Sequence, residues 1–205
     1  MAAPSLPPVS SLPTADPEQI RSVLDMLFEP SPEIHAIAVP AIQQKQPTPE
    51  VAPFTSYASL VRHVGALLFQ LANASSSISP SSPSSSPPSS SPSPSARDRL
   101  HGILGSHPRL GARKVDSAQS RAEQAQLNTG AADEAQCLAA LNLEYEERFP
   151  GLRYVVFVNG RGRDVIMEDM RRRIDRGDIG AEEREAIQAM IDIAIDRAGK
   201  LSSTG

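Results

Sequence analysis

The chain has 205 residues, 40% of them apolar, and a formal net charge of -4 at neutral pH. This size supports one hydrophobic core and argues against two domains. The negative charge argues against a binder of duplex nucleic acid, because such proteins normally present a basic face.

Cysteine and histidine usage argues against disulfide bridges and metal sites. The single cysteine, Cys137, excludes an internal disulfide and fits a reducing compartment. It is expected mid-helix among small and apolar residues, so we interpret it as a packing residue rather than a nucleophile. The four histidines and this cysteine lack the usual metal-ligand spacing. No apolar segment is long enough to span a bilayer and no signal peptide is visible, so we expect a soluble intracellular protein.

The first helix is predicted to follow a disordered tail at residues 1–15, which is rich in proline and serine. Asp16, Pro17 and Glu18 supply an N-cap, a proline at the first helical position and an early acidic residue, which predicts a helix through about Phe28. Its apolar residues recur at helical spacing and form a buried stripe of Ile20, Val23, Leu24, Leu27 and Phe28.

Two further helices are predicted before the middle of the chain. A short helix at about 33–42 precedes a polar, proline-bearing loop at 43–53. Thr55 or Ser56 caps the next helix, which extends to about Ala72. Its predicted apolar face consists of Leu60, Val61, Val64, Leu67, Leu68 and Leu71.

A low-complexity insertion follows at 75–95, where every residue is serine or proline except Ile78. Such a segment cannot bury enough apolar surface to offset its loss of conformational entropy, so we expect a disordered insertion. A longer loop costs little additional closure entropy, so a helical fold is expected to tolerate it.

The densest set of reactive side chains begins at His107. A helix predicted at about 96–104, with Gly105 as its stop, leads to this residue. Pro108 disfavours the helical conformation at His107, which places the imidazole at or just beyond a helix end. An isolated histidine in this position is either a packing or surface residue or an acid/base group that titrates near neutral pH.

A polar helix follows, with Ser120, Glu123 and Gln124 on one face because they occupy positions i, i+3 and i+4. If that face turns toward His107, the site combines a titratable imidazole, a carboxylate that orients it and two neutral polar groups. The same Ser-x-x-Glu spacing is also a capping box, with Ser120 as the N-cap. A cap at Asp116 or Ser117 instead leaves Ser120 available to the site.

The last third of the chain is mostly helical. A helix is predicted at 133–149, and Arg153 to Val158 has the composition of a buried strand. No second clear strand exists to pair with it, so we expect an extended segment in an all-α protein. Two helices at about 164–176, capped by Asp164, and 181–198 follow. The run Arg171 to Arg173 is interpreted as the solvated side of the first of these.

The ordered set of motifs resembles the OHCU decarboxylase family. The resemblance rests on His107-Pro108-Arg109-Leu110-Gly111, on Ser120-x-x-Glu123-Gln124, on Val155 to Arg161 and on an earlier Leu27 to Pro32. It covers about residues 17–198, apart from the insertion. It implies one helical bundle domain over 16–199 with an extended active-site segment, and flexible tails at 1–15 and 200–205.

This family decarboxylates 2-oxo-4-hydroxy-4-carboxy-5-ureidoimidazoline (OHCU) to (S)-allantoin in urate breakdown. The resemblance implies a carboxy-lyase without a cofactor, in which the substrate's own C=N system accepts the electrons released with carbon dioxide. His107 is then the general acid/base, and Glu123 orients or charges its imidazole. The implied substrate-binding residues are Pro108, Ser120, Gln124, Phe157, Val158, Asn159, Gly160 and Arg161, the last for an anionic oxygen.

Two other functions stay open from the sequence. One is a non-catalytic helical interaction module, and the other is a hydrolase that acts on a related ureide. The expected partner is a small-molecule ureide, not nucleic acid or a membrane. The resemblance also allows a homodimer, although no sequence feature identifies an interface. The segment 201–205 does not match the peroxisomal tripeptide, so cytoplasm and peroxisome both stay open.

Overall fold

The computed structural model describes residues 6–44, 54–76, 94–111, 118–124 and 132–202. These residues form helices and no strands, which confirms the all-α prediction. The elements are η1 (Val9–Thr14), α1 (Pro17–Phe28), α2 (Pro32–Gln43), α3 (Tyr57–Ser76), α4 (Ala96–Leu104), α5 (Ala118–Gln124), α6 (Ala132–Arg148), α7 (Arg163–Arg176) and α8 (Ile179–Ser202). None of these helices is long and apolar enough to cross a membrane.

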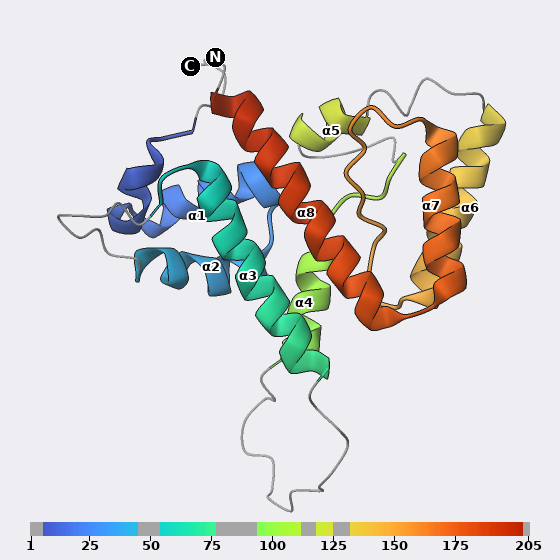
Figure 1. The fold of residues 1–205 in the computed structure, drawn as a ribbon, viewed down its shortest axis with the longest axis horizontal. Coiled ribbons are helices and arrows are strands. Elements are labelled where there is room, and N and C mark those ends of the chain that lie inside the picture. The colour runs from blue at the N-terminus through green and yellow to red at the C-terminus, as the bar shows by residue number, and fades with distance from the viewer. Residues whose placement is uncertain (1–5, 45–53, 77–93, 112–117, 125–131, 203–205) are drawn as a thin grey trace, which may run out of the picture.

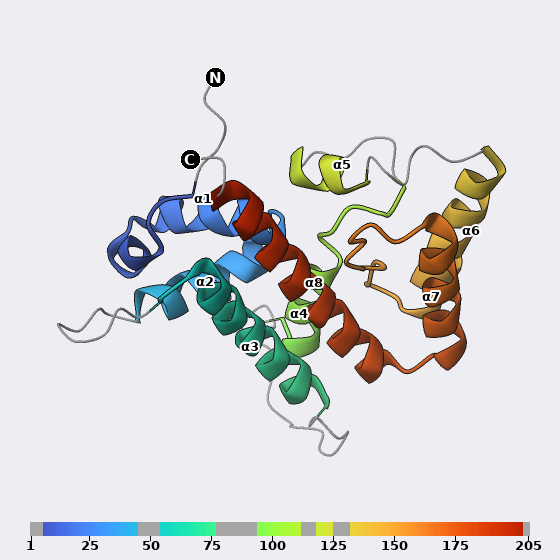
Figure 2. The same ribbon diagram turned by 45° about the horizontal axis from the view of Figure 1, so that its top comes forward.

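Helix α8 is the element around which the others pack. It crosses the molecule between α1 to α4 on one side and the pair α6 and α7 on the other (Figures 1 and 2). Both views also place the short helix α5 beside the C-terminal half of α8. At Gly65 of α3, an added Cβ would overlap the side chain of Ile191, so this glycine permits the close approach of α3 and α8.

Helix α1 forms as its local sequence predicts. The Asp16 carboxylate accepts a hydrogen bond of 2.8 Å from the backbone N–H of Glu18, and Pro17 occupies the first helical position. The five residues of the predicted apolar stripe are all buried. Helix α1 ends at Phe28, and its C-cap residue Glu29 adopts a positive φ of 80°.

Parts of both predicted tails form helical structure. Residues 9–14 form η1, with Leu12 fully buried, and the Tyr57 hydroxyl donates to the Pro7 carbonyl at 2.6 Å. The prediction of disorder over 1–15 is therefore wrong for these residues, because the burial of Leu12 and the contacts of η1 with α2 hold them in place. At the other end, α8 includes residues 200–202 of the predicted tail.

Both ends of the predicted serine- and proline-rich insertion, residues 75–95, belong to neighbouring helices. Helix α3 continues through Ser76, and the Ser75 hydroxyl donates to the Leu71 carbonyl at 2.8 Å. Ser95 caps α4 in a capping box with Asp98. Residues 77–93 of the insertion lie outside the described residues.

The extended segment predicted near Arg153 is confirmed. Residues 152–158 connect α6 to α7 without strand pairing, and four of their side chains are buried: Leu152, Tyr154, Val155 and Val158. The segment ends in a turn at Asn159 and Gly160, whose φ angles of 42° and 74° are both positive. Gly162, not the predicted Asp164, is the N-cap of α7.

The arginine run on α7 is not uniformly solvated. Arg173 is only 3% exposed, and its Nε lies 3.0 Å from both carboxylate oxygens of the fully buried Glu182. Consecutive helical residues point in directions about 100° apart, and here the third residue of the run turns toward the buried Glu182. The prediction for Cys137 is wrong in the opposite direction, because this residue was expected to pack in the core and is exposed.

Candidate active site

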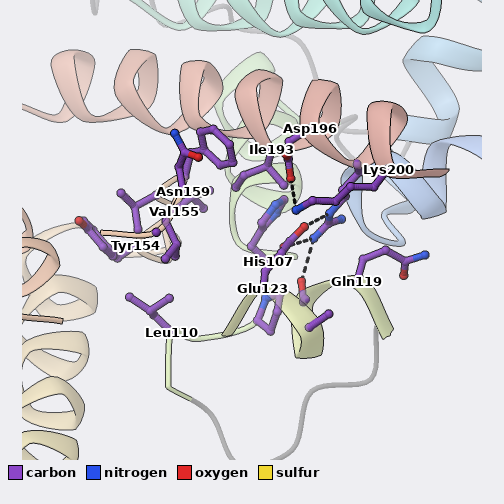
Figure 3. A pocket seen from close by; sticks show the side chains of 18 of the residues that line it. His107, Leu110, Gln119, Glu123, Tyr154, Val155, Asn159, Ile193, Asp196 and Lys200 are labelled. Carbon is purple, nitrogen blue, oxygen red and sulfur yellow. Dashed lines mark hydrogen bonds and ion pairs between the residues drawn. The ribbon is translucent and has the colours of Figure 1, made fainter. Parts of the chain in front are cut away.

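A cavity of about 530 Å³ lies between α5, the extended segment and the C-terminal half of α8. In Figure 3, His107 and Glu123 face it from one side and Tyr154, Val155 and Asn159 from another. The structure brings eight of the ten sequence-predicted site residues to this cavity, namely His107, Pro108, Ser120, Glu123, Phe157, Val158, Asn159 and Gly160.

The position of His107 depends on the turn that follows α4. The Gly105 N–H donates to the His101 carbonyl at 2.8 Å, and a Cβ on Gly105 would lie 2.8 Å from the Gly151 carbonyl oxygen. A side chain is therefore excluded at this turn. The Arg153 guanidinium then donates to the backbone carbonyl of His107 at 2.8 Å, which fixes the main chain beside the cavity.

The His107 imidazole is buried and unsatisfied. The residue is 5% exposed, and within the described part of the chain neither Nδ1 nor Nε2 has a hydrogen-bond partner. Burial lowers the pKa of His107 to about 4, and the nearby Arg197 and Arg153 charges act in the same direction against the opposing charge of Glu29. The imidazole is thus neutral at pH 7 and able to accept a proton.

Arg197 of α8 organises the polar wall of the cavity. This residue is 2% exposed, and it binds the Glu123 carboxylate through Nε at 2.7 Å and Nη2 at 2.8 Å. Its Nη2 also donates to the Ser120 hydroxyl at 2.9 Å and to a Glu29 carboxylate oxygen at 2.8 Å. The guanidinium therefore joins α8 to α5 and to the end of α1.

Ser120 lines the cavity and is not a helix cap. It is the third residue of α5, it is buried, and its hydroxyl donates to the Glu29 carboxylate at 2.5 Å. The capping-box alternative is therefore wrong, because an N-cap precedes the first helical residue. The two other candidate caps, Asp116 and Ser117, lie outside the described residues.

Glu29 was not predicted as part of the site. Its backbone, with φ 80° and ψ 148°, lies in a region that glycine normally occupies, at a cost of about 1–3 kcal/mol. Burial acts to raise the pKa of the Glu29 carboxyl, but the Ser120 hydrogen bond and the Arg197 charge bring it below its usual value. Glu29 is consequently an ionised, buried carboxylate behind the cavity wall.

Two predicted residues, Glu123 and Arg161, differ from expectation in their contacts, and a third, Gln124, is not tested. Glu123 binds Arg197 and makes no hydrogen bond to the imidazole of His107, so it does not orient that ring directly. The Arg161 guanidinium turns back onto the carbonyls of Phe157 and Val158 and does not line the cavity, because its own turn supplies nearer acceptors. Gln124 ends α5, but its side chain lies outside the described residues.

Several cavity residues come from α8 and were missed. Ile193, Asp196, Arg197 and Lys200 line it together, and Lys200 and Asp196 form an ion pair of 2.5 Å (Figure 3). Their i, i+3, i+4 and i+7 spacing places them on one helical face, and this is the signal that sequence reading had available. Among the described residues, no cluster of His, Cys, Asp or Glu side chains is arranged to hold a metal ion.

Comparison with known proteins identifies the family of this chain. Residues 13–199 match the family model of OHCU decarboxylase. A search of curated proteins found no match. The matched range contains His107 and all four members of the Arg197 cluster, which are Glu29, Ser120, Glu123 and Arg197. The chain therefore belongs to the OHCU decarboxylase family, the carboxy-lyases that convert OHCU to (S)-allantoin in urate catabolism.

Proposed function

We propose that the cavity binds OHCU and that His107 transfers the proton during its decarboxylation. The observation that carries this proposal is the buried imidazole at the cavity, neutral and without a hydrogen-bond partner among the described residues. A buried polar group is normally satisfied, so an unsatisfied one beside a cavity is suited to bind a ligand. Its low pKa keeps the ring unprotonated at neutral pH, which is the form that can take up a proton.

The chemistry follows from the substrate, whose C4 carries both the hydroxyl and the carboxylate. The bond between C4 and the carboxylate carbon breaks and carbon dioxide leaves. The electron pair moves into the ring C=N group, whose nitrogen takes up one proton from solvent. Neutral His107 accepts the hydroxyl proton as the C4 carbonyl forms. The imidazolium then delivers that proton to the ureido-bearing carbon, and delivery to one face gives one enantiomer.

The other cavity groups hold the substrate in place. We assign Ser120 and the peptide groups of residues 157–160 to hydrogen bonds with the ring and ureido groups. Pro108 fixes the turn, and Arg197 contributes the cationic group that the sequence assigned to Arg161. Glu123 holds Arg197 in this role. Gln124 stays a predicted substrate ligand.

The experiment that tests the proposal is stereochemical. OHCU is generated in situ from urate with urate oxidase and hydroxyisourate hydrolase, this protein is added, and the circular dichroism of the product is followed. We expect rapid growth of the (S)-allantoin signal together with carbon dioxide release. Racemic product at the uncatalysed rate, from folded protein, contradicts the proposal. Turnover of a related ureide without carbon dioxide release identifies a hydrolase instead.

The proposal extends to assembly and compartment. Leu143 on α6 and Val165 on α7 are large apolar residues exposed at 53% and 45%, and we propose that a homodimer covers them. Light scattering of the purified protein is expected to give twice the monomer mass, and a monomer mass contradicts this. We propose that the reaction takes place in the cytoplasm or the peroxisome, and imaging of a fluorescent fusion distinguishes the two.

A further inference from the structure

Glu29 stands behind the cavity wall and contacts two of its residues. One carboxylate oxygen accepts hydrogen bonds from the Ser120 hydroxyl at 2.5 Å and from Arg197 Nη2 at 2.8 Å. Glu29 is itself 3% exposed, and it is not among the residues that line the cavity. Its effect on a bound substrate must therefore pass through Ser120 and Arg197.

The main-chain conformation at the end of α1 directs the Glu29 carboxylate toward Arg197. Glu29 has φ 80° although it is not glycine, and the following Pro30 favours its extended ψ of 148°. The carbonyl of Leu27, two residues earlier, accepts a hydrogen bond of 3.3 Å from Arg197 Nη1. The end of α1 thus holds the same guanidinium with a backbone oxygen and a carboxylate oxygen.

The contact also anchors α5. This helix has seven residues, which is too short to be stable on its own, so it depends on tertiary contacts. Hydrogen bonds of Ser120 and Glu123 with Glu29 and Arg197 join it to α1 and α8. The Glu123 side chain is 22% exposed, whereas that of Glu29 is 4% exposed, so Glu29 is the more deeply buried of the two carboxylates.

We propose that Glu29 is a positioning residue for this site, which sets the places of Arg197 and Ser120 and so aligns the substrate with His107. The proposal rests on the proposed function. Small displacements of groups that align a substrate cost about 100-fold in rate, and Glu29 connects two such groups from different helices.

The test compares Glu29→Gly and Glu29→Gln with a matched control. Glycine accepts the positive φ without strain but removes the carboxylate, whereas glutamine keeps one oxygen acceptor for Ser120 and Arg197. The control is Glu183→Gln, which alters another buried carboxylate, one that binds His101 at 2.8 Å and does not line the cavity. Each variant is assayed by circular dichroism with OHCU generated in situ, and its thermal melt is recorded.

We expect KM to rise about 10-fold or more and kcat/KM to fall about 100-fold in Glu29→Gly, with partial recovery in Glu29→Gln. Partial unfolding lowers the apparent kcat but leaves KM unchanged, so KM separates positioning from stability. Glu183→Gln is expected to keep wild-type KM. Wild-type KM in both Glu29 variants overturns the proposal while the decarboxylase function stands. Absence of turnover in wild-type protein overturns the proposed function itself.

Discussion

Two buried arginines in this molecule have carboxylate partners, but only Arg197 of the two lines the cavity. Arg173 on α7 is 3% exposed and Arg197 on α8 is 2% exposed. Arg173 pairs with Glu182, donates to the Val155 carbonyl at 3.2 Å and lies 4.7 Å from the centre of the Tyr154 ring. Arg197 pairs with two carboxylates and also borders a cavity.

The difference between them lies in the surroundings. Around Arg173, the hydroxyl of Tyr145 donates to Glu182 and the hydroxyl of Tyr154 donates to Asp169 at 2.6 Å. Such a connected buried network makes the packing of neighbouring elements specific. Arg197 instead lies near an imidazole whose two nitrogens have no described partner. A buried ion pair alone therefore does not identify a functional site, and the proposed site rests on the imidazole without a described partner and on the cavity beside Arg197.

The largest expected effect comes from removing the imidazole of His107, which has no described partner. His107→Asn is expected to lower kcat by about 1,000-fold, because proton transfer by a positioned side chain contributes about 100- to 10,000-fold. The melting temperature at pH 7 is expected to stay near that of wild type, since the ring makes no hydrogen bond to the described residues. The dichroism assay and a thermal melt measure both, and retained activity removes His107 from the mechanism.

Exchanging each arginine for methionine tests the two clusters against each other. Arg173→Met leaves Glu182 buried without its partner and is expected to destabilise the fold by about 3–5 kcal/mol, with KM unchanged in the folded fraction. Arg197→Met is expected to destabilise as well, but also to lower kcat/KM by about 100-fold. Denaturant unfolding and steady-state kinetics separate these effects. Equal kinetic losses in the two variants contradict the distinction.

Substitutions of the carboxylate partners, Glu123 and Glu182, test the same distinction with smaller expected effects. Glu123→Gln keeps an oxygen for Arg197 but loses the charge, and we expect kcat/KM to fall about 30-fold because the guanidinium shifts in the cavity wall. Glu182→Gln is expected to reduce stability and leave kcat/KM unaltered. An unchanged rate in Glu123→Gln contradicts its role in holding Arg197.

The last prediction concerns the stability of the fold at acid pH. Folding lowers the pKa of His107 from its ordinary 6.5 to about 4, so the unfolded chain binds more protons in that interval. Stability therefore falls as pH falls from 6.5 toward 4, by about 1.4 kcal/mol per pH unit for this residue. His107→Asn is expected to flatten that part of the profile. Parallel wild-type and variant profiles from urea unfolding exclude a lowered pKa.

The local sequence determined most of the helices and the placement of His107 at the site. Periodic apolar residues and capping groups such as Asp16 act within one or two turns, so they fix helices without knowledge of the fold. Pro108 likewise fixes the conformation before it, which places His107 beyond a helix end. Sequence also showed that one extended segment without a partner strand belongs in a helical protein.

Only the tertiary structure decided which charged residues meet. Glu29 and Arg197 are separated by 168 positions, yet their side chains lie 2.8 Å apart. Arginine is usually exposed on a helix surface, so the sequence gives no sign that Arg173 and Arg197 are buried. Their burial depends on which carboxylates the neighbouring helices bring to them. Apolar periodicity encodes the buried face of one helix, but the pairing of distant charges is set by packing between helices, and no local pattern records it.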